Sequence, residues 1–171
     1  VDICSLDNIW IVTSADFLDI VQKQLPDIPR ENILLEPCRR NTAPCIAYVS
    51  WVIKSINPNA NIVVSPSDHV ITNVPVFQNA IRECLQFTSS SDAIVTLGIK
   101  PDRPETGYGY IEADLSCSTV INKNVFRVES FKEKPSFDVA QEYITQPNYF
   151  WNSGLFIWNV STIVNAFRVY Q

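Results

Sequence analysis

The sequence predicts an α/β fold with a mostly parallel mixed sheet and helices on both faces. Three observations support this. Apolar runs of strand length alternate with segments of amphipathic helical spacing, Pro, Gly and Ser residues separate them, and strand and helix alternate from the start of the chain. Strands and helices in this order form parallel sheets with right-handed crossovers. With 171 residues, 46% of them hydrophobic, the chain can bury a core as one domain or a large part of one.

The predicted elements follow the chain in order. Strands are expected at residues 9–12, at 33–35, in the run that starts at 61 and ends at Asp68, and at 93–97, with helices at 14–25, 43–56 and 76–87 between them. After Gly98 the pattern changes, because residues 108–113 and 125–131 are typical of strands with no helix between them. An antiparallel excursion is therefore expected there. A short helix at 136–144, a strand at 155–158 and a final helix from Ser161 complete the prediction.

Composition excludes several classes of protein. A net charge of -5 and a pI near 4.8 argue against a nucleic-acid binder, which needs a basic face. Neither a membrane-spanning run nor a targeting segment is present in the sequence, so we expect a cytoplasmic protein without a membrane partner. The five cysteines are odd in number and never spaced C-x-x-C, which predicts free thiols rather than disulfides or a structural zinc site.

Six cationic residues lie in or beside three Pro-punctuated segments. This placement suits a small anionic ligand held by loops on an acidic body, although solvated loop charges would look the same. The six are Arg39, Arg40, Lys100, Arg103, Lys132 and Lys134.

Asp68 lies in the small polar loop in which the apolar run from Asn61 ends. In open α/β sheets ligands bind beyond the carboxyl ends of the strands, so a carboxylate there can hold a metal ion or a hydroxyl group. A plain capping role for Asp68 remains the alternative. His69, the single histidine, is interpreted as a structural neighbour of the site.

The segment from Glu36 to Pro44 is a loop that enters a helix. The first N–H groups of that helix, which starts at Asn41 and Thr42, could bind an anion or a polar base edge together with Arg39 and Arg40. The two oxygens of the Glu36 carboxylate match adjacent N–H donors such as N1 and N2 of guanine. An ordinary helix start is the alternative interpretation.

Three later segments carry groups suited to a sugar phosphate. Gly107 and Gly109 flank Tyr108, which exposes backbone beside an aromatic ring, although a hairpin entry has the same pattern. Glu133 can accept from sugar hydroxyls and Lys134 can neutralise a phosphate, or the two form a surface salt bridge. The amide of Asn152 can donate and accept beside Trp151, or it belongs to a polar turn before a buried strand. Each of these segments alone is a weak signal.

Together the five segments resemble a known family. They read E-P-x-x-R-N-T-A-P, S-D-H, L-G-I-x-P-x-x-P-E-T-G-Y-G-Y-I, F-x-E-K-P and W-N-S-G-x-F. In this order and at these spacings they resemble the mannose-1-phosphate guanylyltransferases, or GDP-mannose pyrophosphorylases, of the sugar nucleotidyltransferases. The resemblance covers residues 9–164 and implies a Rossmann-like three-layer fold.

The resemblance also implies a reaction and its residues. GTP and mannose 1-phosphate would form GDP-mannose and pyrophosphate with Mg²⁺. Asp68 would be a metal ligand and, with Lys134, a catalytic residue. The nucleotide would contact Glu36, Pro37, Arg40, Asn41 and Thr42, and the sugar phosphate would contact Gly107, Tyr108, Gly109, Glu133, Lys134 and Asn152.

The sequence departs from the family in four places. Arg39 stands where a Gly is usual, and Leu155 replaces a common Met. The family's Gly-rich loop and a later acidic metal ligand are not found. We therefore expect residues 1–171 to be the central part of a single nucleotidyltransferase domain, nearly inactive alone. A relative that uses another nucleotide or hexose phosphate, a non-catalytic nucleotide-sugar-binding module and a homo-oligomer all remain open.

Overall fold

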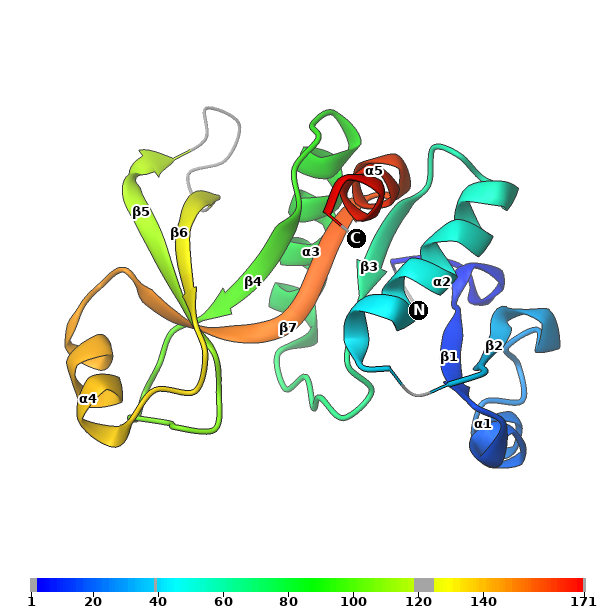
Figure 1. Cartoon of the computed structure of the whole chain (residues 1–171), viewed down its shortest axis with the longest axis horizontal. Coiled ribbons are helices and arrows are strands. Elements are labelled where there is room, and N and C mark those ends of the chain that lie inside the picture. Colours follow the sequence, from blue (N-terminus) through cyan, green and yellow to red (C-terminus); the bar gives the residue numbers. More distant parts are fainter. Residues whose placement is uncertain (1–2, 39, 119–124, 171) are drawn as a thin grey trace. The chain divides into compact units, whose positions relative to one another are not determined.

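The structure is a computed structural model that describes residues 3–38, 40–118 and 125–170 (Figure 1). The fold is mixed α/β, as predicted. Contacts divide the chain into two compact units. Unit 1 comprises residues 1–62, 70–94 and 158–171, and unit 2 comprises residues 63–69 and 95–157.

Unit 1 begins with a parallel strand pair. Strand β1 (Ile11–Ser14) pairs with β2 (Ile33–Glu36), and helix α1 (Leu18–Gln24) connects them. Ile11 lies opposite Ile33 and Ser14 lies opposite Glu36. This β-α-β unit is the one predicted from the apolar runs, and its register places Glu36 at the carboxyl end of β2.

Three helices complete unit 1. They are α2 (Thr42–Ile56), α3 (Val74–Ser89) and α5 (Val160–Tyr170). Helices α2 and α5 pack together, and the rings of Trp51 and Phe167 lie 6.2 Å apart. Helix α3 begins after Asn73, whose side chain accepts a hydrogen bond from the Val76 N–H, with a proline in the first turn where no N–H is needed. The helical core residues are Ile46, Val49, Ile81, Cys84, Val160, Ile163 and Val164.

The main sheet has the strand order β3-β7-β5-β6, with β4 also paired to β7. Its strands are β3 (Asn61–Val64), β4 (Val95–Ile99), β5 (Tyr110–Ser118), β6 (Phe126–Lys132) and β7 (Tyr149–Asn159). The β4–β7, β5–β7 and β5–β6 pairs are antiparallel.

The prediction of a mostly parallel sheet is therefore wrong for the main sheet. Local patterns indicate which segments are strands, but they do not determine which strand lies beside which. Strand β7 comes late in the chain, is 11 residues long, and takes the central place next to both β4 and β5. Gly98 lies inside β4 rather than beyond its end, because β4 stays paired with β7 as far as Ile99, two residues past the apolar run at 93–97.

The two faces of the sheet in unit 2 differ. Along β7 the odd-numbered residues from Tyr149 to Ile157 are buried and the residues between them are half-buried. Tyr149 and Trp151 form a core cluster with Tyr110 and with helix α4 (Phe137–Thr145), and the Tyr143 and Tyr149 rings stack at 4.2 Å. We call this the Trp151 face. The opposite side, which carries Asn152, is the Asn152 face.

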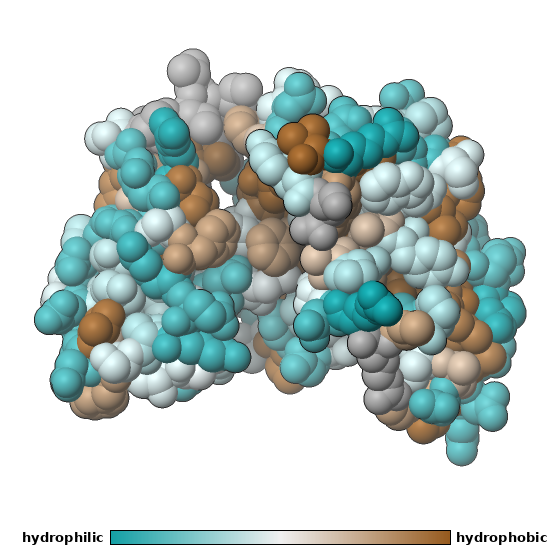
Figure 2. Space-filling model, viewed as in Figure 1, coloured by the Kyte–Doolittle hydropathy of each residue, from teal (hydrophilic) through white to brown (hydrophobic). Residues whose placement is uncertain are grey.

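The described surface has no single dominant apolar area in the view of Figure 2, where hydrophobic residues show in separate places among hydrophilic ones. Exposed large hydrophobic residues include Val70 and Val76 in unit 1 and Phe131 in unit 2. Single exposed residues of this kind are normal in proteins. Among the described residues, no helix has the length and apolar character that crossing a bilayer requires.

Candidate functional site

Three of the predicted sugar-phosphate residues meet on the Asn152 face. Tyr110 lies opposite Lys132 in β6 and opposite Trp151 in β7. Gly109, one residue earlier, therefore lies between Glu133 and Asn152, and its carbonyl oxygen accepts a 2.8 Å hydrogen bond from the Asn152 N–H. Side chains of directly opposed residues point to the same face of a sheet. Residues distant in sequence thus form one small group.

Gly109 leaves space between its two neighbours. A Cβ atom added there would lie 3.3 Å from Oε2 of Glu133 and 3.7 Å from Cβ of Asn152. A side chain would therefore occupy the gap between the carboxylate and the amide. With glycine, backbone is open to a ligand at this point.

The Asn152 amide is oriented by hydrogen bonds. Its Oδ1 atom accepts from the Gly154 N–H at 3.1 Å and lies 3.3 Å from Oγ1 of Thr96. Because the oxygen is engaged internally, the NH₂ group is the part that Asn152 offers as a donor. Thr96 was not among the predicted site residues, although it is the one polar residue in the apolar run at 93–97.

An irregularity in β7 follows Asn152. Thr96 lies opposite Phe156 and Gly98 opposite Asn152, so β7 uses four residue steps where β4 uses two. Gly154 lies inside this bulge with a φ of 72°. A Cβ atom added at Gly154 would lie 3.3 Å from Cγ of Pro66. The loop after β3, which holds the exposed Asp68, thus contacts β7 two residues from Asn152.

Lys134 has a backbone conformation that is unusual for a residue other than glycine. It follows Glu133 directly, with a φ of 40°, and its Nζ lies 3.7 Å from Oε1 of Glu133. Both side chains are largely exposed, so this ion pair contributes little to stability. Lys134 and Asn41 are the non-glycine residues at positive φ in the described part of the chain, and both lie in predicted ligand-binding segments. Strained backbone of this kind concentrates at functional sites.

Tyr108 lies on the other side of the sheet from this group. Its ring meets the Trp151 ring edge-on, with centroids 5.4 Å apart and planes at 86°. Tyr108 lies in the bend before β5, and this ring contact places it on the Trp151 face, whereas Gly109 lies beside Glu133 and Asn152. The structure therefore brings Gly109, Glu133 and Asn152 together and places the Tyr108 ring apart from them.

Several of the six cationic residues have protein partners. Nζ of Lys100 donates to the carbonyl oxygens of Gln146 and Pro147, both at 3.2 Å, just beyond the end of α4. Nζ of Lys132 lies 3.5 Å from Oε2 of Glu112. These two lysines stabilise loop and sheet contacts, which a count of charges in the sequence does not reveal.

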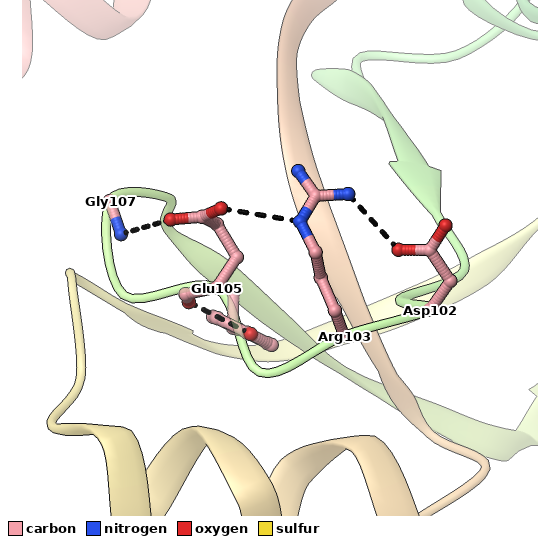
Figure 3. Close-up of polar contacts among 5 residues, drawn as sticks. Asp102, Arg103, Glu105 and Gly107 are labelled. Carbon is pink, nitrogen blue, oxygen red and sulfur yellow. Dashed lines mark hydrogen bonds and ion pairs between the residues drawn. The ribbon is translucent and has the colours of Figure 1, made fainter.

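Arg103 is also engaged. Its guanidinium group lies 3.2 Å from Oδ1 of Asp102 and 3.4 Å from Oε2 of Glu105 (Figure 3). It also lies 5.0 Å from the centre of the Trp151 ring. Desolvation lowers the pKa of Arg103, but the charges of the two neighbouring carboxylates outweigh it, so that the pKa is raised. The pKa of the Glu105 carboxyl is lowered, chiefly by the hydrogen bond from Gly107.

The predicted nucleotide residues lie in unit 1, in the turn from β2 into α2. Glu36 is the last residue of β2, and Thr42 opens α2 with Asn41 before it at a φ of 66°. Pro37 and Arg40 are exposed between them. Arg39, where the sequence departs from the family, lies outside the described residues. That this turn and the Asn152 face line one site stays a prediction.

A cysteine contacts the carboxylate of this turn. Burial raises the pKa of the Cys45 thiol, and the nearby Glu36 raises it further by its charge and by accepting a hydrogen bond. Cys45 lies in the first turn of α2. The end of β2 and the start of α2 are thus in contact through these two side chains.

The described residues do not form a ready-made metal cage. They contain no group of three or more His, Cys, Asp or Glu side chains arranged to hold a metal ion. Mg²⁺ commonly keeps several waters and is bound by one or two carboxylates plus substrate phosphates. The exposed Asp68 fits that kind of site and does not form a closed metal cage.

The family is decided by comparison with known proteins. Residues 4–168 match the model of the nucleotidyl transferase family. The chain belongs to the nucleotidyl transferase family. The segments that the resemblance relied on, from the Glu36 turn to the Asn152 strand, all lie within the matched residues.

Members of this family with curated names include several that are similar to the chain. It is 36% identical to a mannose-1-phosphate guanylyltransferase of Escherichia coli strain K12, over 99% of this chain and 37% of that protein. It is 37% identical to the xanthan biosynthesis protein XanB of Xanthomonas campestris pv. campestris, over 91% of this chain and 32% of that protein. The chain thus spans about a third of the length of the curated relatives it matches.

Two solved structures have a fold similar to that of this chain. Mannose-1-phosphate geranyltransferase from Thermus thermophilus matches with a TM-score of 0.78 and 30% identity, over 92% of this chain and 44% of that one. Mannose-6-phosphate isomerase from Helicobacter pylori matches with a TM-score of 0.80 and 26% identity, over 96% of this chain and 60% of that one.

Proposed function

We propose that this nucleotidyltransferase forms GDP-mannose and pyrophosphate from GTP and mannose 1-phosphate. The observation that carries the proposal is the position of Gly109 between the Glu133 carboxylate and the Asn152 amide. An acceptor and a donor on either side of open backbone suit the hydroxyl groups of a hexose. The curated relatives named above supply the identity of the substrates.

In the proposed reaction, a phosphate oxygen of mannose 1-phosphate attacks the α-phosphorus of GTP in line. A new P–O bond forms as the bond from the α-phosphorus to the bridging oxygen breaks, and pyrophosphate leaves with the electron pair. The phosphate nucleophile is already ionised near neutral pH and needs no general base. Catalysis in this chemistry depends on positioning and electrostatics.

The chain's residues have distinct roles in the proposal. Glu133 accepts hydrogen bonds from sugar hydroxyls, the Asn152 NH₂ group donates one, and Lys134 offsets charge on the sugar phosphate. Glu36 accepts from N1 and N2 of guanine, while the N–H groups at Asn41 and Thr42 face a phosphate of GTP. In these assignments, each residue contacts one part of one substrate.

Asp68 is the residue that would hold Mg²⁺. When bound, the ion would supply positive charge beside the reacting phosphates. The cytoplasmic location predicted from the sequence belongs to the same proposal.

Parallel assays of the intact protein test the proposal. GTP, UTP and dTTP are each supplied with mannose 1-phosphate or glucose 1-phosphate, and pyrophosphate release is measured. We expect GTP with mannose 1-phosphate to be used at least about tenfold better than any other pair. A preference for UTP would overturn the role of Glu36, and release with no pair would overturn the proposed activity.

A further inference from the structure

In the loop between β4 and β5, residues 100–109, the Glu105 carboxylate contacts two other residues of the same loop. Oε1 of Glu105 accepts a 3.0 Å hydrogen bond from the Gly107 N–H, and Oε2 lies 3.4 Å from Nε of Arg103 (Figure 3). The Glu105 N–H in turn donates to the Arg103 carbonyl oxygen at 3.0 Å. Both oxygens of one side chain therefore act within its own loop.

This loop is anchored to the core of unit 2 at several points. The Arg103 guanidinium lies over the ring of Trp151, which is 7% exposed. The hydroxyl of the fully buried Tyr110 donates to the Glu105 carbonyl oxygen at 2.9 Å. Tyr108 packs edge-on against the same Trp151. The loop thus approaches the sheet from the Trp151 face.

Gly109 is the point where this anchored loop becomes strand. Its carbonyl oxygen accepts a hydrogen bond from the Asn152 N–H, and the position that a Cβ would take at Gly109 faces Oε2 of Glu133. The position of the Gly109 backbone therefore depends on contacts on the Trp151 face, and the hydrogen bond from Gly107 to Glu105 is made only two residues earlier. A displacement at Gly107 would change the separation between Gly109 and its neighbours on the Asn152 face.

We infer that Glu105, paired with Arg103, is a positioning residue that fixes the Gly107–Gly109 backbone and thereby sets the affinity of the Asn152 face for a hexose phosphate. The inference rests on the proposed function for the identity of that ligand. Glu105 does not itself belong to the Asn152 face. It acts through Gly107, whereas Glu133 and Asn152 are the groups proposed to touch the sugar.

The opposing interpretation is a surface ion pair without consequence. Asp102 provides a matched control, because its carboxylate also pairs with Arg103, at 3.2 Å, while the Gly107 N–H donates to Glu105. The Asp102 side chain is 76% exposed, against 29% for Glu105. If only charge near Arg103 mattered, Asp102 and Glu105 would be equivalent.

The first measurement is amide hydrogen exchange in the intact, ligand-free protein. We expect exchange at Gly107 to be about tenfold faster in Glu105→Ala, only slightly faster in Glu105→Gln, which keeps an acceptor oxygen, and unchanged in Asp102→Asn. Exchange at Ile157, which is fully buried in β7 of unit 2, reports on the fold of the unit that holds Glu105. If Glu105→Ala speeds exchange at Ile157 as well, then Glu105→Leu, which also removes the acceptor from Gly107 but keeps side-chain volume, replaces it. Unchanged Gly107 exchange in the folded variant, or equal effects in Asp102→Asn, would overturn the inference.

The second measurement is calorimetric binding of mannose 1-phosphate and of GTP to the same variants. We expect the Kd for mannose 1-phosphate to rise about tenfold in Glu105→Ala and to stay within about twofold in Asp102→Asn, with the Kd for GTP unchanged in both. Equal binding by wild type and Glu105→Ala overturns the positioning role. No binding of mannose 1-phosphate by wild type overturns the proposed function instead, while Gly107 exchange still decides whether Glu105 fixes the loop.

Discussion

Gly109 and Glu133 approach so closely that a methyl group at residue 109 would lie 3.3 Å from Oε2 of the glutamate. Gly109→Ala should therefore narrow the proposed sugar position without removing any polar group. We expect the Kd for mannose 1-phosphate to rise by about tenfold or more, because a small steric change in a tight site has effects of this size. Titration calorimetry would measure it. A normal Kd would remove Gly109 from the proposed site, and unchanged GTP binding is the control.

Asp68 should be essential for turnover and dispensable for folding. In the intact protein, we expect Asp68→Asn to lower the rate of pyrophosphate release by about a hundredfold or more, since it would lose a ligand to Mg²⁺ beside the reacting phosphates. The adjacent His69→Gln is the matched control, because His69 is exposed and has no proposed chemical role. Near-normal turnover in Asp68→Asn would refute the metal role.

Gly98 has no space for a side chain. A Cβ atom there would lie 2.9 Å from Cβ of Phe150 and 3.1 Å from its Cγ. Gly98→Ala should destabilise the fold by about 1–3 kcal/mol, as overpacking does. Urea unfolding would measure the loss. In a Phe150→Gly background both atoms that crowd residue 98 are gone, so the two losses should be less than additive; strict additivity would contradict a direct clash.

Tyr149 should make stability sensitive to alkaline pH. Burial, then the hydrogen bond to Glu112 and its charge, raise the pKa of Tyr149 to about 12. An unfolded tyrosine ionises near pH 10, so the contribution is complete below about pH 10 and is lost as the pH rises through about 12. Urea midpoints measured from pH 9 to 12 should fall less steeply in Tyr149→Phe than in wild type. Parallel curves would contradict this assignment.

Lys100 should act on stability rather than on anion binding. Lys100→Met removes the donors to the Gln146 and Pro147 carbonyl oxygens, and we expect a loss of about 1 kcal/mol in the free energy of unfolding. The Kd for mannose 1-phosphate should not change. Weaker binding at unchanged stability would restore Lys100 as an anion ligand.

Local patterns predicted much of this fold. Segments with a clear period, such as the strand that becomes β2 and the helix that becomes α2, form close to where periodicity places them. Spacing within a segment is a local property, and local propensity decides it. Which strands pair, and whether they run parallel or antiparallel, is not a local property. The partner of β4 is β7, reached across the intervening β5, β6 and α4 by the Val95–Ile157 pairing, and neither segment's composition specifies it.

The candidate site divides in the same way. Gly109, Glu133 and Asn152 were predicted from residue types and resemblance, and the structure brings them together. The roles of Lys100 and Arg103 were not predictable, because a sequence shows the charge of a side chain and not its partners. Tyr108 was assigned to a ligand by its position between glycines, while its ring packs against Trp151. Tyr108 lies in a bend before β5, so this partner is a tertiary contact that the local sequence does not specify.

The central place of β7 has a consequence for how the protein is made. Its partners β3, β4 and β5 leave the ribosome long before residues 149–159 do, so the main sheet must wait for the strand that joins them. Until then the edges of three strands are unpaired and open to association with other chains. Slow synthesis near the end of this segment would prolong that exposure, and a nascent chain stalled before Tyr149 should depend on chaperones in a way that one stalled after α5 does not.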